Sequence, residues 1–170
     1  MKKIIVLIIM LTISVFAQEK SFKIIKSESG SKMLVGVCGR AELQKAPFGK
    51  WFNTEYNSYI PKFLNKNDLQ TRIMKYNIVI VMGTWCPDSR KEVPRFYKLI
   101  DSLKFPQSQI KLITVTRKKE GLARETEGLN IQRVPTFIFY KDGKEVGRII
   151  EHPSFDRLED DVQNIVFSNK

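Results

Sequence analysis

The feature that most constrains the fold is a continuous apolar run, Ile78-Val79-Ile80-Val81-Met82, in the middle of the chain. It is rich in branched side chains and has no polar face, which is typical of a strand buried on both sides in a parallel sheet. The chain has 170 residues, enough for one domain with a real core. Its hydrophobic share of 42% and charged share of 28% are those of an ordinary globular protein.

Helical and strand patterns surround this run. The first predicted elements are a helix over 68–76 capped by Asp68, the strand over 78–82, a helix from Cys86 to about Leu103 and a strand over 110–115. A short helix over 119–127, ended by Gly128, is expected next. Strands over 136–140 and 145–150 follow, joined by a hairpin at Asp142-Gly143, and a last helix begins after Pro153. Strands joined through helices lie parallel, whereas a hairpin is antiparallel. We therefore expect an α/β domain with a mixed four-stranded central sheet and helices on both faces.

The first residues follow a different pattern. Lys2 and Lys3 precede an apolar run over residues 4–16, and small residues end it at Ala17. This pattern predicts a secretory signal peptide over residues 1–17, with an uncleaved anchor as the alternative. No second apolar stretch reaches spanning length, so we expect a periplasmic or other extracytoplasmic protein without stable membrane insertion after cleavage.

Residues 18–54 are expected to be an N-terminal extension to a main domain over 55–170. Residues 18–31 are polar and predict a loose lead-in, and residues 33–38 predict a short strand. Aromatic side chains then crowd one stretch: Phe48, Trp51, Phe52, Tyr56 and Tyr59. We interpret them as the cover of one edge of the core rather than as a ligand platform.

The net charge of +11 is spread thinly along the chain. Its densest basic run, Arg117-Lys118-Lys119, lacks interleaved aromatics, which favours a solvated loop over nucleic-acid binding. The single histidine, His152, and two distant cysteines do not make a metal-ligand set, so we expect neither a metal nor another cofactor.

The chemistry centres on Cys86, which follows the buried strand and begins a helix. The free N–H groups and the dipole at a helix N-terminus stabilise a thiolate, and Arg90 and Lys91 add positive charge. Asp88 opposes them, and its predicted role is a cap-like one. The sequence therefore predicts an accessible, moderately acidic and reactive thiol rather than an inert core cysteine.

Residues 83–94, Gly-Thr-Trp-Cys-Pro-Asp-Ser-Arg-Lys-Glu-Val-Pro, resemble the active-site stretch of the thioredoxin superfamily. They are similar in particular to exported thiol–disulfide oxidoreductases of the cytochrome-maturation type. The positions that match that motif are Trp85, Cys86, Pro87, Arg90, Lys91, Glu92 and Pro94. The resemblance covers roughly residues 55–170 and implies a thioredoxin-like fold.

A second family mark is the triplet Val134-Pro135-Thr136, which begins 48 residues after Cys86. The resemblance implies a cis peptide bond before Pro135, with this proline facing Cys86. It also implies that the backbone of Val134 pairs with a bound substrate chain, in a groove shared with Trp85 and Pro87.

The sequence departs from the family at two positions. Ser89 stands where the family has its second, resolving cysteine, and a hydroxyl cannot resolve a mixed disulfide. Ile80 stands where the thioredoxins proper carry a buried acid that helps to move the resolving proton. The candidate catalytic positions are therefore Cys86, Ser89 and Pro135, in a single-cysteine version of the motif.

Cys38 is a possible second thiol, and the sequence leaves three roles open for it: a resolving partner of Cys86, a structural disulfide partner or a buried small residue. The leading hypothesis is an exported monothiol protein that exchanges disulfides with protein or small-molecule thiols, by isomerisation or deglutathionylation. The alternative is a non-enzymatic module that binds peptides or proteins. A third option is a glutaredoxin-like carrier of an iron–sulfur cluster. The motif of that group has other residues than this chain at the two positions between Cys86 and Ser89, which makes this option the weakest.

Overall fold

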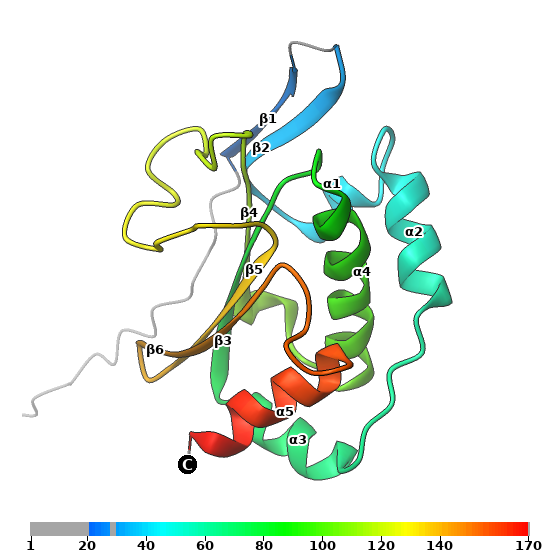
Figure 1. Cartoon of the computed structure of the whole chain (residues 1–170), viewed down its shortest axis with the longest axis vertical. Coiled ribbons are helices and arrows are strands. Elements are labelled where there is room, and N and C mark those ends of the chain that lie inside the picture. The colour runs from blue at the N-terminus through cyan, green and yellow to red at the C-terminus, as the bar shows by residue number, and fades with distance from the viewer. Residues whose placement is uncertain (1–20, 28–29, 170) are drawn as a thin grey trace, which may run out of the picture.

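The structure, a computed structural model, describes residues 21–27 and 30–169. These residues form a six-stranded sheet in the order β1-β2-β4-β3-β5-β6 (Figure 1). The strands are β1 (Ser21–Lys26), β2 (Lys32–Cys38), β3 (Tyr76–Met82), β4 (Ile110–Thr114), β5 (Thr136–Lys141) and β6 (Lys144–Ile150). The prediction of four strands was therefore wrong, because β1 and β2 extend the sheet beyond β4. The predicted signal peptide lies outside the described residues.

The two added strands form a hairpin from the segment expected to be a loose lead-in. β1 pairs antiparallel with β2 along its whole length, from Ser21 opposite Val37 to Lys26 opposite Lys32. Gly36 permits this close pairing, because its φ is +112° and a Cβ there would lie 2.2 Å from the Ser21 carbonyl oxygen. β2 in turn pairs antiparallel with β4, which ties the N-terminal residues to the central sheet.

The centre and far edge of the sheet follow the sequence pattern. β3 lies parallel to β4 and antiparallel to β5, and the apolar run is the middle of the sheet as expected. β5 and β6 form the predicted hairpin. Its turn residues Asp142 and Gly143 have φ values of 51° and 77°, the left-handed conformation that a tight hairpin turn requires.

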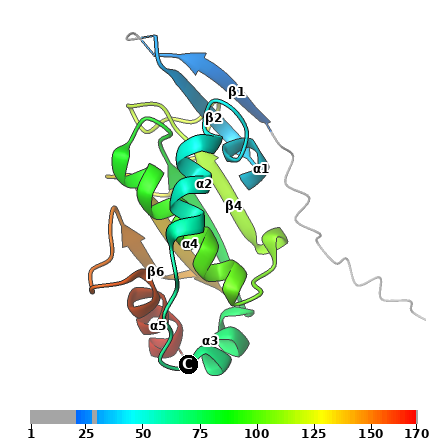
Figure 2. The ribbon, with the colours of Figure 1, turned by 90° about the vertical axis from the view of Figure 1, so that its right-hand side faces the viewer.

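The described α-helices are α1 (Arg40–Leu43), α2 (Gly49–Ser58), α3 (Lys66–Ile73), α4 (Pro87–Ser102) and α5 (Leu158–Ser168). All five contribute to the same hydrophobic core, on the face of β3 that carries Ile78, Ile80 and Met82. Figure 2 shows α2 and α4 in front of the sheet. The expectation of helices on both faces was wrong. The helix predicted over 68–76 ends at Ile73, and Tyr76 begins β3.

The other face of the sheet is covered by the loop over residues 115–135. A short helix was predicted there over 119–127, but the structure has turns in its place. The Glu125 carboxylate accepts hydrogen bonds from the backbone N–H groups of Leu122 and Ala123, which fixes a non-helical turn. Leu129 and Ile131 pack from this loop onto a small core cluster that includes Val81 and Cys86. Across the described part of the chain, no helix is both long and apolar enough to cross a membrane.

Candidate active site around Cys86

Cys86 occupies the turn between the central strand β3 and helix α4. It is the N-cap residue of α4, with extended backbone angles, and its carbonyl accepts the first helical hydrogen bond from Arg90 N–H at 3.0 Å. Pro87 follows at the first helical position, where a missing N–H costs nothing. This turn lies at the end of the sheet that also carries the β1–β2 hairpin (Figure 1).

The Cys86 thiol faces the segment that contains Val134 and Pro135. Its Sγ donates a hydrogen bond to the Val134 carbonyl oxygen at 3.2 Å. The peptide bond between Val134 and Pro135 is cis. Cys86 is only 7% exposed, so the thiol is more covered than the sequence led us to expect. The cover comes from the 115–135 loop, whose apolar residues pack in the same cluster as Cys86.

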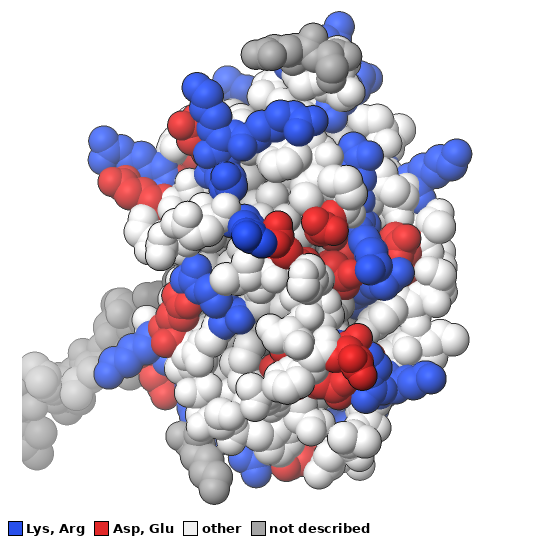
Figure 3. Space-filling view, in the orientation of Figure 1, with Lys and Arg blue, Asp and Glu red and all other residues white. Residues whose placement is uncertain are grey.

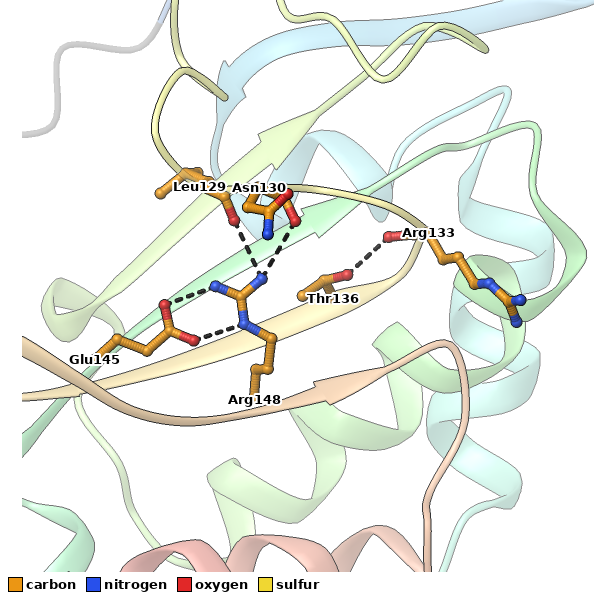
Figure 4. A network of polar contacts seen from close by, with 6 residues as sticks. All are labelled: Leu129, Asn130, Arg133, Thr136, Glu145 and Arg148. Atoms are coloured by element: carbon orange, nitrogen blue, oxygen red, sulfur yellow. Dashed lines mark hydrogen bonds and ion pairs between the residues drawn. The ribbon is translucent and has the colours of Figure 1, made fainter.

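A polar network holds the Val134 segment in place (Figure 4). The Arg148 guanidinium donates to the carbonyl oxygens of Leu129 and Asn130 at 3.1 and 3.4 Å, and it pairs with the Glu145 carboxylate. The Thr136 hydroxyl donates to the Arg133 carbonyl at 2.7 Å. These bonds anchor the chain on both sides of Val134, so the carbonyl that faces the thiol has a defined position. No local sequence signal pointed to this role of Arg148, because the two carbonyl groups that it binds lie 18 and 19 residues away in the sequence.

Trp85 and Pro87, the expected groove residues, flank the thiol along the chain. The Trp85 indole N–H donates to the Val115 carbonyl at 3.0 Å, and the ring lies under the Arg117 guanidinium, 4.9 Å from its centroid. The ring also covers Gly83, where a Cβ would lie 2.5 Å from it. Trp85 is thus fixed and half-buried, whereas Pro87 is exposed.

Ser89 lies inside the first turn of α4 and is fully buried. Its hydroxyl accepts a hydrogen bond from the backbone N–H of Gly83 at 3.2 Å. This bond ties the helix to the turn that precedes Cys86. The observed contact of the hydroxyl therefore stabilises the turn. Because residue 89 is a serine, it has no sulfur with which to take part in disulfide exchange.

Cys38 is 2% exposed and belongs to the large core on the helical face of the sheet. Cys86 belongs to the small cluster on the opposite face. In the register of the sheet, Cys38 lies opposite Leu112, which in turn lies opposite Ile80, six residues before Cys86. Between these two described cysteines the structure has no disulfide.

Positive side chains surround the first turn of α4. Arg90 Nε donates to the Thr84 carbonyl at 2.6 Å, and its guanidinium lies 6.0 Å from the centroid of the Trp51 ring. Lys91 pairs with the buried carboxylate of Glu92 at 3.2 Å. Asp88 is exposed. Trp51, which we had interpreted only as core cover, thus reaches the candidate site from α2.

No metal centre is visible near this site: within residues 21–27 and 30–169, no three His, Cys, Asp or Glu side chains come together in a way that could hold an ion. His152 is exposed, and its Nδ1 lies 3.1 Å from the Pro153 carbonyl oxygen.

The comparison with known families agrees with this geometry. The family profile described as Thioredoxin matches residues 61–164, which include Cys86, Val134 and Pro135. The chain belongs to the thioredoxin family. The match begins just after α2 and ends within α5, so β1, β2 and α2 lie outside it.

Two curated relatives of this thioredoxin-family chain support the assignment. The first, Thioredoxin Asp f 29 of Aspergillus fumigatus, is 32% identical over 73 residues, 43% of this chain and 63% of the relative. The second, the thioredoxin-like protein R548 of Acanthamoeba polyphaga mimivirus, is 27% identical over 101 residues, 57% of this chain and 70% of the relative. The chain therefore spans somewhat under two thirds of the length of the fungal thioredoxin.

Among solved structures, a Pseudomonas aeruginosa protein of unknown function matches with 18% identity and a TM-score of 0.37, covering 70% of this chain and 69% of that one. The family assignment does not rest on this likeness. The thioredoxin-like domain itself supports a function of the redox type.

Proposed function

We propose that this protein is an exported monothiol exchange protein that acts on disulfides through Cys86. The observation that carries the proposal is the hydrogen bond from the Cys86 thiol to the Val134 carbonyl, at the N-terminus of α4. The bond places a sulfur beside a backbone edge to which a substrate chain can pair. The helix N-terminus favours the negative charge that develops on the attacking sulfur.

The reaction is a thiol–disulfide exchange. Cys86 loses its proton, and its thiolate attacks one sulfur of a substrate disulfide. A bond forms between Cys86 and that sulfur, the substrate S–S bond breaks, and the second substrate sulfur leaves as a thiolate that takes up a proton. A second thiol, from the substrate itself or from a small-molecule thiol, then attacks the mixed disulfide and regenerates Cys86.

The monothiol character rests on three positions. Ser89 is buried and hydrogen-bonded to Gly83 where a resolving thiol would stand. Ile80 is fully buried and has no proton to give. Cys38 packs on the opposite face of the sheet from Cys86. Single-thiol chemistry suits disulfide isomerisation or removal of a glutathione-type group better than net reduction.

The test compares the wild-type chain with Ser89→Cys. We expect the wild type to accumulate a mixed disulfide with a protein disulfide substrate, and Ser89→Cys to release that substrate as its new thiol resolves the bond. If the wild type never forms the mixed disulfide while Ser89→Cys reacts readily, native exchange is excluded.

A second candidate function, a peptide-binding module without exchange, is favoured by the low exposure of Cys86. In that case the groove predicted between Trp85, Pro87 and Val134 holds an extended chain, and the thiol is only part of its wall. The variant Cys86→Ala separates the two functions, because exchange requires the sulfur, whereas binding by the groove survives its removal.

Export is part of the proposal and rests on the pattern of residues 1–17. Expression of the full chain in a bacterial host with N-terminal sequencing of the periplasmic product tests it. The expected product begins after Ala17, and retention of the intact chain in the cytoplasm contradicts the assignment.

A further inference from the structure

Two cation-lined pockets lie on either side of Cys86. The α2 pocket, of about 520 Å³, lies between α2 and the start of α4, and its walls include Lys50, Trp51, Pro87, Arg90 and Lys91. The hairpin pocket, of about 460 Å³, lies between the β1–β2 hairpin and the loop after β4, and its walls include Lys26, Met33, Arg117, Lys118 and Glu120.

Both pockets are connected to the thiol through its neighbours in the chain. Pro87, directly after Cys86, lines the α2 pocket. Trp85, directly before Cys86, lies under the guanidinium of Arg117, which lines the hairpin pocket. A chain that reaches from one pocket to the other therefore passes the turn that carries the sulfur.

The charge of both pockets is mainly positive and mainly uncompensated. Within the described part of the chain, no salt bridge includes Lys50, Arg90, Lys26, Arg117 or Lys118. The one carboxylate in the wall of the α2 pocket, Glu55, is already paired with Arg95 at 2.8 Å. On the face of the molecule drawn in Figure 3, Lys and Arg side chains gather at the end that carries the β1–β2 hairpin.

We propose that the two pockets select acidic polypeptide substrates, with carboxylates on both sides of the cysteine whose disulfide Cys86 attacks. This inference rests on the proposed exchange function and names its substrate class. A polypeptide fits better than another polyanion for two reasons. Only a polypeptide offers both a cysteine sulfur for Cys86 and a backbone for the Val134 carbonyl, and the aromatic and proline walls of the α2 pocket suit side chains.

Three synthetic peptides test the inference. Each has one cysteine blocked as a thionitrobenzoate disulfide, flanked on both sides by Glu, by Gln or by Lys. Attack by Cys86 forms the peptide–protein disulfide and releases the coloured thionitrobenzoate anion, whose appearance gives the rate. At low salt we expect the Glu peptide to react roughly tenfold faster than the Gln peptide, through electrostatic steering. The advantage should vanish near 1 M salt, where the screening length is about 3 Å.

Matched charge reversals separate the pockets from the overall charge. Lys50→Glu and Lys118→Glu, one in each pocket, should each lower the Glu-to-Gln rate ratio about threefold, the size of an exposed charge pair. Lys75→Glu makes the same change in net charge at an exposed position before β3, at the far end of that strand from Cys86, and should leave the ratio unchanged.

Equal rates for the three peptides would overturn the inference, and so would a Lys75→Glu variant that lowers the Glu-to-Gln rate ratio as much as Lys50→Glu and Lys118→Glu do. A third contrary result is a single-stranded oligonucleotide that displaces the Glu peptide at a lower concentration than the unblocked Glu peptide does. If none of the three peptides reacts, the exchange function is lost, and the substrate preference of the pockets is then tested by binding of the Glu peptide with Ser in place of Cys. Trp51 and Trp85 are the only tryptophans in the sequence, so their fluorescence reports that binding. Salt-sensitive binding of this peptide supports the selection of acidic polypeptides by the two pockets, and absence of binding refutes it.

Discussion

The thiol of Cys86 donates a hydrogen bond to the carbonyl oxygen of Val134, at a distance of 3.2 Å and across 48 residues of sequence. In the proposed exchange, a substrate chain that pairs with the Val134 backbone displaces this bond and brings its own sulfur next to Cys86. The proposal therefore couples the position of the nucleophile to that of the substrate backbone through this one contact.

Arg148 is predicted to position the Val134 segment from a distance. Arg148→Met removes the bonds to the carbonyl oxygens of Leu129 and Asn130 and should cost about 1–2 kcal/mol of unfolding free energy. It should also slow exchange, because the carbonyl beside the thiol is less well fixed. Arg133→Met is the control: Arg133 belongs to the same segment but is exposed and pairs only with Glu151, so urea denaturation should show little change. Equal losses for both variants would refute a special role for Arg148.

Ser89 is predicted to stabilise the active-site turn without taking part in exchange. Ser89→Ala leaves the N–H of Gly83 without its acceptor in a buried place, which should cost about 1–2 kcal/mol. Ser102→Ala, on the same helix, removes a half-buried hydroxyl that bonds only to the Leu99 carbonyl and should be nearly neutral. Thermal unfolding measures both. Loss of exchange in folded Ser89→Ala would show instead that the hydroxyl takes part in the chemistry.

Gly36 is predicted to be required for the attachment of β1. Gly36→Ala combines a φ of +112° with a Cβ 2.2 Å from the Ser21 carbonyl, so it should destabilise the chain by about 2–3 kcal/mol and release β1. Gly128→Ala has a similar positive φ but open space around its Cβ, and should cost about 1 kcal/mol. Urea denaturation with hydrogen exchange of β1 amides distinguishes the two. Similar effects of the two variants would mean that the close approach at Gly36 is unimportant.

The tyrosines predict how stability depends on alkaline pH. Burial is the largest cause that raises the pKa of all five tyrosines in the sequence: Tyr56, Tyr59, Tyr76, Tyr97 and Tyr140. For Tyr59, the hydrogen bond to Glu159 raises the pKa further. An unfolded chain releases these protons near pH 10, whereas the folded chain retains them, so stability is full below about pH 10 and falls above it. Ultraviolet titration should show tyrosinate forming together with unfolding. A separate ionisation step near pH 10 in the folded protein would contradict this.

Local patterns predicted the centre of the fold because each was strong by itself. The apolar run became β3, the Asp142-Gly143 pair became a hairpin turn, and the helix after Cys86 ends within a residue of the expected position. β1 was missed because a strand at the sheet edge depends on pairing with β2 and not on its own burial. The helix over 119–127 was overpredicted because Glu125 bonds to the backbone of a turn instead.

The site was predicted in part for the same reason. Cys86, Val134 and Pro135 stand in recognisable motifs, and the structure brings them together. The burial of Cys86 and the Arg148 network depend on the 115–135 loop, whose conformation has no periodic sequence pattern.

The most direct test of the account is a map of the glutathione adduct. The full chain, incubated with glutathione disulfide and digested without reductant, is analysed by mass spectrometry. We predict a glutathione adduct on Cys86 in the wild type and in Cys38→Ala, and none in folded Cys86→Ala. An adduct on Cys38 alone, or no adduct while a free cysteine peptide reacts under the same conditions, would contradict the central claim that Cys86 is the exchanging thiol.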